Sequence, residues 1–248
     1  GAPKTSTITL HSPVFHDNVG AGFSLIHDVL GDTKFTSMYA DFAFRVKLSQ
    51  TSNLTFGLKG GLDLYTANFS NIDLDQYDDP SFQYNFYNKA LPNFGFGVYY
   101  TFKNRFYAGV SIPRMLEHKF IGENTVISNG ILKGHYYFIT GASLKMSRFL
   151  EFKPAALVKM TVGAPIQCDV TALFELYKRI NFGLMYRTND GVGALVGIYL
   201  FDKLLLGYSY DFSFTNTTSR YNQGSHEIML RYDFIFSSHH RIKSPRYF

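Results

Sequence analysis

The glycine-rich stretch GVGALVG, residues 191–197, is the first candidate for chemistry, because closely spaced glycines can wrap around a phosphate group. A phosphate-binding loop of that kind follows a strand and opens a helix. Here Gly191, Gly193 and Gly197 fall at even spacing inside an alternating pattern, which places them on one face of a strand. The stretch therefore predicts a strand with a small-residue face rather than a cofactor site.

A second candidate is the acidic stretch NIDLDQYDD, residues 71–79, which is similar to the start of a calcium-binding loop. Such a loop also requires glycine at its sixth position and glutamate at its twelfth, where this chain has Gln76 and Phe82. We interpret the stretch as an acidic outer loop, with a weak divalent-ion site as the alternative.

The histidines and the single cysteine do not form a recognisable metal or catalytic motif. The chain has 8 histidines but no His-Glu-x-x-His, and Cys168 has no cysteine partner for zinc. His226 and Glu227 are neighbours in an alternating segment, so their side chains point to opposite faces and cannot form a dyad. His239 and His240 could bind a metal ion opportunistically. We expect no enzyme activity, no cofactor and no dedicated metal site, and we expect Cys168 to be a small hydrophobic residue facing lipid.

The elements that must position any site follow from a period-2 pattern, seen clearly in INFGLMYR, residues 180–187. One set of alternate residues is apolar, and the other set is small, polar or charged. Alternation of this kind predicts β-strands, because successive side chains point to opposite faces. The pattern recurs along the chain and predicts about thirteen strands, at 4–12, 18–28, 34–48, 53–66, 93–102, 105–113, 134–146, 150–162, 166–177, 180–188, 191–201, 204–214 and 225–236.

The predicted connections differ in length between the two ends of the strands. Short connections, at 49–52, 103–104, 147–149, 178–179 and 202–203, alternate with longer ones at 67–92, 114–133 and 215–224. Bacterial outer-membrane barrels have short periplasmic turns and longer outer loops. The alternation places the chain's end on the periplasmic side. Because such barrels usually have an even number of strands, we expect one further strand before residue 1.

The face opposite the apolar one is dominated by Gly, Ser, Thr, Tyr and Asn, with sparse charges of both signs. A water-exposed face would instead be rich in Lys and Glu, so the pattern favours a confined polar lumen over a soluble sheet, which is the alternative. The apolar face, with Phe182, Leu184, Val196, Ile198, Leu206 and Leu230, is predicted to contact lipid. The predicted lumen charges, which should pair with one another, are Asp41, Arg45, Lys59, Asp63, Lys145, Lys159, Asp169, Glu175, Arg187, Asp211, Glu227 and Arg231.

Composition supports the same fold class. Charged residues are 17% of the chain, below the usual quarter, and Phe and Tyr together make up another 17%. The net charge of +5 is scattered along the chain, which excludes the clustered basic face of a nucleic-acid binder. We predict an all-β protein: a transmembrane up-and-down antiparallel β-barrel over residues 1–236, with about fourteen strands when complete.

Residues 237–248 follow the last predicted strand and form a basic and aromatic tail, SSHHRIKSPRYF from residue 237 onward. A flexible periplasmic terminus is one interpretation. Arginine and aromatic residues often dominate interfaces, so we also interpret the tail as a partner-binding segment. The candidate partner-binding residues are Arg241, Lys243, Ser244, Pro245, Arg246, Tyr247 and Phe248.

Several strings of this sequence resemble one known family. They are GAPKTSTITLHSP at 1–13, LPNFGFGVYY at 91–100, VGAP at 162–165, GALVG at 193–197, GSHEIMLRYDF at 224–234 and SPRYF at 244–248. Together they closely resemble the PorP/SprF family of outer-membrane proteins, which belong to the type IX secretion system of Bacteroidetes. Family members usually have further mature sequence before the first of these strings.

The resemblance implies a role in protein export and gliding motility rather than catalysis. It implies partners in the periplasmic ring of the secretion system and an exported cargo, such as the C-terminal domain of an adhesin, as well as the lipid bilayer. The family has no catalytic residues to carry over. A channel for small solutes is the alternative function, and a barrel enzyme has little support in the sequence.

Overall fold

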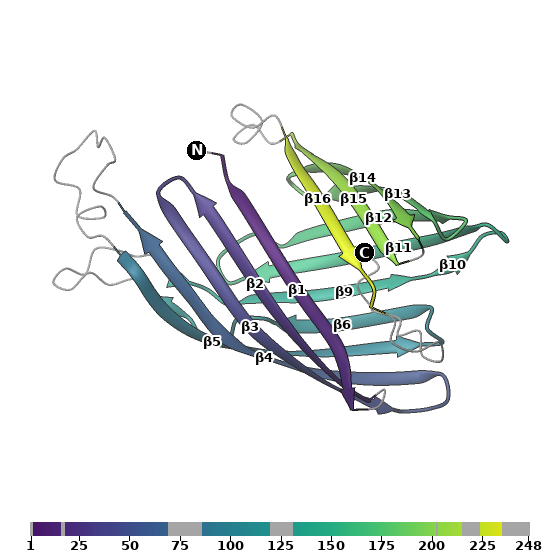
Figure 1. Cartoon of the computed structure of the whole chain (residues 1–248), viewed down its shortest axis with the longest axis horizontal. Helices are drawn as coiled ribbons and strands as arrows, with labels where there is room; N and C mark the ends of the chain where they lie inside the picture. The colour runs from purple at the N-terminus through teal and green to yellow at the C-terminus, as the bar shows by residue number, and fades with distance from the viewer. Residues whose placement is uncertain are drawn as a thin grey trace. The chain divides into compact units, whose positions relative to one another are not determined.

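A computed structural model describes residues 2–15, 18–68, 86–119, 131–201, 203–214 and 224–234, and its regular elements are β-strands. Among these residues there is no helix of the length and hydropathy that crossing a membrane would require. Figure 1 shows the strands β1 (Lys4–Phe15), β2 (Val19–Leu30), β3 (Thr33–Lys47), β4 (Ser52–Ala67), β5 (Phe86–Phe102), β6 (Phe106–Ile112), β7 (His118–Lys119), β8 (Ile131–Leu132), β9 (His135–Ala142), β10 (Leu144–Lys145), β11 (Leu150–Thr161), β12 (Gln167–Leu176), β13 (Ile180–Arg187), β14 (Gly191–Leu200), β15 (Leu204–Ser213) and β16 (Ser225–Tyr232).

The strands follow one another in a 14-stranded sheet, in the order β1-β2-β3-β4-β5-β6-β9-β11-β12-β13-β14-β15-β16, with β10 paired to β11. A separate ribbon joins β7 and β8. Each strand of the main order lies beside its neighbour in the chain, so the predicted all-β, up-and-down antiparallel fold is confirmed. β1 and β16 end the order, and closure of the sheet by these two strands stays a prediction.

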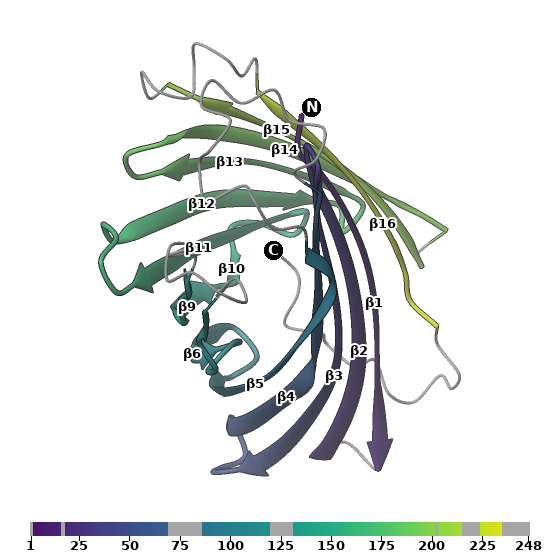
Figure 2. The same ribbon diagram turned by 90° about the vertical axis from the view of Figure 1, so that its left-hand side faces the viewer.

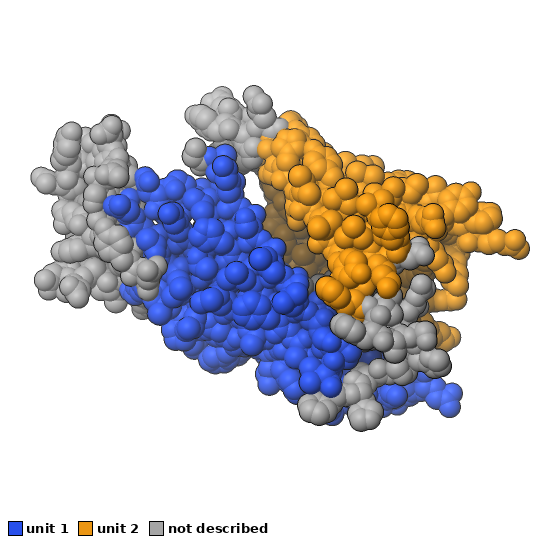
Figure 3. Space-filling view, viewed as in Figure 1, with its two compact units in different colours: residues 1–100, 109–137, 161–164 blue, residues 101–108, 138–160, 165–248 orange. Residues whose placement is uncertain are grey.

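The chain divides into two compact units, coloured separately in Figure 3. Unit 1 comprises residues 1–100, 109–137 and 161–164, and unit 2 comprises residues 101–108, 138–160 and 165–248. In unit 1, β1 to β4 pair antiparallel without a crossover. In unit 2, β11 to β16 form the corresponding antiparallel ladder, which Figure 2 shows from the side.

The two faces of the sheet divide by polarity as the alternation predicts. The residues predicted to contact lipid are exposed, from 41% for Leu206 to 69% for Leu230, and none of them lies in a core. Their cross-strand register keeps them together: Phe182 lies opposite Val196, and Leu206 lies opposite both Ile198 and Leu230. Buried residues, including Tyr39, Asp63, Leu173 and Glu175, occupy the opposite face.

The strand boundaries differ from the prediction in several places, including the end of β1 at Phe15 and the end of β16 at Tyr232, and three differences are larger in kind. β5 begins at Phe86 rather than near residue 93, so it runs through Pro92, which has no N–H to donate to a neighbouring strand. The predicted connection 114–133 contains the short β7 and β8. The predicted strand 134–146 is interrupted at Ser143, whose backbone N–H donates to the carbonyl of Arg105.

Candidate functional site

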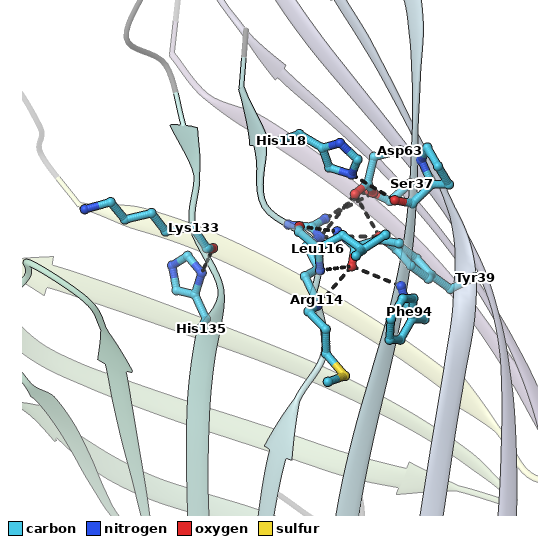
Figure 4. A network of polar contacts seen from close by, with 12 residues as sticks. Ser37, Tyr39, Asp63, Phe94, Arg114, Leu116, His118, Lys133 and His135 are labelled. Carbon is cyan, nitrogen blue, oxygen red and sulfur yellow. Dashed lines mark hydrogen bonds and ion pairs between the residues drawn. The ribbon is translucent and has the colours of Figure 1, made fainter.

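The most developed polar cluster of unit 1 is centred on Arg114, in the extended segment after β6 (Figure 4). Arg114 Nη2 donates to Ser37 Oγ at 3.1 Å and to Asp63 Oδ1 at 3.3 Å. Arg114 Nε lies 3.4 Å from the Tyr39 hydroxyl and 3.3 Å from Asp63 Oδ2. The Tyr39 hydroxyl in turn donates to Asp63 Oδ2 at 2.7 Å. We call Ser37, Tyr39, Asp63 and Arg114 the Arg114 cluster.

Electrostatics explain why these four side chains stay together. The Asp63 side chain is 0% exposed, and a buried carboxylate is tolerated only when it is paired and hydrogen-bonded. Burial disfavours the charge of Arg114, but the hydrogen bond with Tyr39 and the charge of Asp63 outweigh it and raise the pKa of the guanidinium. The ion pair between Arg114 and Asp63 therefore holds a loop segment against β3 and β4.

The register of β3 and β4 places the side chains that contact Arg114 next to one another. Ser37 of β3 lies opposite Asp63 of β4, and Tyr39 lies opposite Gly61. The Tyr39 ring crosses Gly61 so closely that a Cβ there would meet a ring carbon at 2.8 Å. Lys59 lies 4.7 Å above the same ring and 3.7 Å from Asp41.

A glycine permits the segment after β6 to cross the polar face. A Cβ on Gly95 would lie 2.5 Å from the carbonyl oxygen of Pro113, so only glycine lets the chain pass over β5 here. The direction of the chain changes at Pro113, just past the end of β6 at Ile112. Arg114 then reaches across to the cluster on β3 and β4.

Asn93 of β5 fixes the backbone of that segment around Leu116, which is labelled in Figure 4. Its Oδ1 accepts hydrogen bonds from the N–H groups of Met115 and Leu116, both at 3.0 Å, and its Nδ2 donates to the carbonyl of Leu116 at 2.9 Å. Asn93 is 5% exposed, so these bonds are shielded from water. We call residues 113–117 the anchored segment.

Unit 2 carries a second charged network on the polar face. Asp169 accepts from Lys159 Nζ at 2.7 Å and from Arg187 Nε at 3.0 Å. Arg187 Nη1 also donates to Asp190 Oδ2 at 3.4 Å, and Ser213 Oγ donates to Asp190 Oδ1 at 2.5 Å. Separately, Lys153 Nζ donates to Glu175 at 2.8 Å, with both side chains 10% exposed.

The structure brings some of the predicted lumen charges together and gives others different partners. Asp41 pairs with Lys59, and Asp169 pairs with Lys159 and Arg187. Asp63 and Glu175 pair with Arg114 and Lys153, which the sequence analysis did not name. Lys153 shares the parity of Lys159 in its strand, so the alternation could have identified it, whereas no periodic signal marks Arg114.

The remaining predicted lumen charges lie apart from these networks. Arg231 bonds to Asp233 at 2.9 Å, and Glu227 accepts from Ser209 Oγ at 3.4 Å. Asp211 lies against Gly193, whose absent side chain leaves room for its carboxylate. Arg45 and Lys145 make no ion pair with the residues that the structure describes.

The other candidates of the sequence analysis have these outcomes. Gly191, Gly193 and Gly197 lie within β14, so the prediction of a small-residue strand face is confirmed. Cys168 shares its face with exposed Val170, and His226 contacts the Tyr208 hydroxyl at 2.7 Å, on the face opposite Glu227. Within the described ranges, no group of three His, Cys, Asp or Glu could hold a metal ion.

Two predicted features lie outside the described residues. One is the acidic stretch 71–79, together with Phe82. The other is the tail, with His239, His240 and the candidate partner-binding residues Arg241, Lys243, Ser244, Pro245, Arg246, Tyr247 and Phe248.

Comparisons with known proteins agree with this architecture. The curated proteins contain no match to this chain. A family described as type IX secretion system membrane protein PorP/SprF matches residues 1–232. That range covers every strand of the sheet, from β1 to β16. The chain therefore belongs to the PorP/SprF family of type IX secretion system membrane proteins.

Proposed function

We propose that this outer-membrane protein is a non-enzymatic component of type IX secretion and gliding, which recruits or anchors exported cargo and associates with the periplasmic ring. The proposal rests on the anchored segment, which is held in place by the hydrogen bonds of Asn93 and Arg114. An ordered start to a long connection suits a binding surface, because fixing a loop in advance lowers the entropy lost on binding.

The cargo end is inferred from the connections. The connections 68–85, 113–134 and 214–224 join strand ends of one parity, and they are longer than those of the other parity. The anchored segment starts the second of these connections, and His118 Nε2 contacts the carbonyl of Pro92 at 2.8 Å just beyond it. We assign exported cargo, such as an adhesin C-terminal domain, to this end.

The ring end is inferred from the opposite parity. The connections 48–51, 103–105, 177–179 and 201–203 lie at this end. We assign the tail 237–248, which follows β16 in the sequence and carries arginine, lysine and aromatic residues, to the same end. These residue types suit a protein interface. We assign the periplasmic ring to this end and place the chain's C-terminus in the periplasm.

Two variants of the full protein separate the two assignments. Arg114→Ala should lower capture of a cargo C-terminal domain in a pull-down and leave ring components bound. Deletion of 237–248 should lower ring capture and leave cargo capture and membrane insertion intact. Loss of both partners in both variants would point to misfolding, and unchanged capture in both would refute the assignments.

A small-solute channel is the second candidate, favoured by the glycines on the polar face of β14. Two features argue against a channel: the charge pairs on the polar face of each unit, and the anchored segment on that face of unit 1. Conductance in planar bilayers distinguishes the two functions.

A further inference from the structure

A groove in unit 2 lies where β13 begins and β14 ends, at the short-turn end of the sheet. It has a volume of about 390 Å³ and is lined by Arg179, Ile180, Ile198, Tyr199, Leu200 and Phe201. Ile180 and Ile198 are cross-strand partners, and the Tyr199 N–H donates to the carbonyl of Arg179 at 2.8 Å. The groove therefore has one cation, Arg179, beside a mostly apolar surface, which we call the apolar floor.

The apolar floor is continuous with the face that carries the exposed apolar residues. Ile180 and Ile198 are 39% and 43% exposed, and the next residues along that face are Phe182 and Val196. Phe201 at the rim is 90% exposed. A ligand in the groove would have one end at the turns and the other along a face that meets hydrocarbon in a membrane protein of this kind.

Among the residues that the structure describes, the charged side chains of the turns at this end of unit 2 are mostly cations. The cations in or beside the turns at this end of unit 2 are exposed and make no ion pair with described residues; they are Lys103, Arg105, Lys145 of β10, Arg148, Lys178, Arg179 and Lys203. Two acidic residues lie nearby: Glu151, opposite Lys145, accepts a hydrogen bond from Ser143, and Asp233 pairs with Arg231. Asp202, beside Lys203, lies outside the described residues. We call these cations the basic rim.

The backbone conformation of these turns indicates that their cationic and aromatic side chains are retained for a reason other than turn geometry. Lys103, Tyr177, Lys178 and Phe201 all have φ between 51° and 56°, in the left-handed region. Glycine occupies that region at no steric cost and is the usual residue in tight hairpin turns. Cationic and aromatic residues occupy these positions although a left-handed φ disfavours any residue with a Cβ.

We propose that this groove binds an anionic phospholipid of the leaflet that meets the short turns, with its phosphate on Arg179 and its acyl chains along Ile180, Ile198 and Leu200. Guanidinium groups bind phosphate through paired, charge-assisted hydrogen bonds. Basic pockets beside membrane-spanning segments hold anionic head groups in the same way. An acidic protein would match the charge but not the apolar floor, which opens toward the hydrocarbon region.

The test uses the full protein in nanodiscs that contain phosphatidylcholine with a minor share of phosphatidylglycerol, and native mass spectrometry to count retained lipids. The wild type should retain phosphatidylglycerol over phosphatidylcholine. Arg179→Gln should weaken that preference about tenfold, the scale of one lost charged hydrogen bond. Arg105→Gln, a basic-rim cation outside the groove, is the matched control and should change it less than about twofold.

Other outcomes overturn the proposal. Equal losses in the two variants would show diffuse attraction to the rim rather than a site. Displacement of the lipid by millimolar inorganic phosphate would show an anion site without lipid specificity. Reduced capture of ring components by Arg179→Gln, with lipid retention unchanged, would show a protein-docking surface. If Arg179→Gln does not fold, photo-crosslinking of the wild type by labelled phosphatidylglycerol must map to residues 179–201, and labelling elsewhere refutes the site.

Discussion

At the residue scale, Asp63 is the side chain whose environment is most demanding, because its carboxylate is completely buried and depends on Arg114 and Tyr39. Removing one partner of such a pair leaves an uncompensated charge, which costs more than the pair contributes when it is intact.

We expect Arg114→Ala to lower the free energy of unfolding by about 2 kcal/mol. It leaves the Asp63 charge without its cation, but the Arg114 side chain is 37% exposed, so water replaces part of the lost pairing. Urea unfolding in detergent micelles or vesicles measures this loss. In a double-mutant cycle with Asp63→Asn, the second substitution should recover part of the loss. Strict additivity of the two substitutions would contradict the coupling described here.

Lys178 illustrates a residue kept at a conformational cost. Its φ of 56° is a strained value for a side chain with a Cβ, so Lys178→Gly should stabilise the protein by about 1 kcal/mol. Lys203→Gly is the control, since Lys203 lacks a left-handed φ and should gain nothing. Unfolding midpoints measure both, and a gain for Lys203→Gly equal to that of Lys178→Gly would refute the argument.

At the element scale, the approach of the anchored segment to β5 depends on Gly95. Gly95→Val should push the segment at Pro113 away from β5 and thereby separate Arg114 from Asp63. The free energy of unfolding should fall by about 2 kcal/mol. Gly60→Ala, where an added Cβ meets nothing within 4 Å, should stay within about 0.5 kcal/mol of the wild type. Hydrogen exchange at the N–H groups of Met115 and Leu116, which Asn93 protects, would report the separation, and unchanged protection in Gly95→Val would contradict it.

The apolar face of β13 and β14 gives a prediction of its own. Leu184 is 68% exposed, so Leu184→Arg should cost about 2–4 kcal/mol if it lies near the bilayer midplane. Ser209→Arg on the polar face, beside Glu227, should cost less because an acidic partner is available. Folding into lipid vesicles measures both variants, and equal costs would mean that the two faces meet similar surroundings.

At the scale of the whole molecule, the polar face of each unit carries paired charges. Unit 1 has Asp63 with Arg114, and unit 2 has Glu175 with Lys153 and Asp169 with Lys159 and Arg187. Because an unpaired buried charge is costly, separating these pairs to let ions pass would cost free energy.

We therefore expect negligible conductance from the complete protein in planar bilayers. Arg114→Ala, which frees the anchored segment, should raise conductance if that segment narrows a passage, whereas Arg105→Ala in an exposed turn should not. A large and stable conductance from the wild type would favour the channel function instead.

The amino-acid sequence by itself determined the strands and their faces, since alternation is local and each residue's face follows from its parity. INFGLMYR forms β13 over the predicted residues, and its apolar members are exposed as expected. The turn positions followed for the same reason, and the strings that resemble PorP/SprF identified the family, which the match over residues 1–232 confirms.

Only the tertiary structure decided which charges meet. Arg114 is 51 residues from Asp63 and 75 from Tyr39, and its reach depends on the step over Gly95, which no local pattern encodes. The entry of β5 through Pro92 and the pairing of Lys153 with Glu175 likewise depend on neighbouring strands. Local periodicity determines the direction in which a side chain points, whereas its partner depends on the register and path of segments distant in the chain.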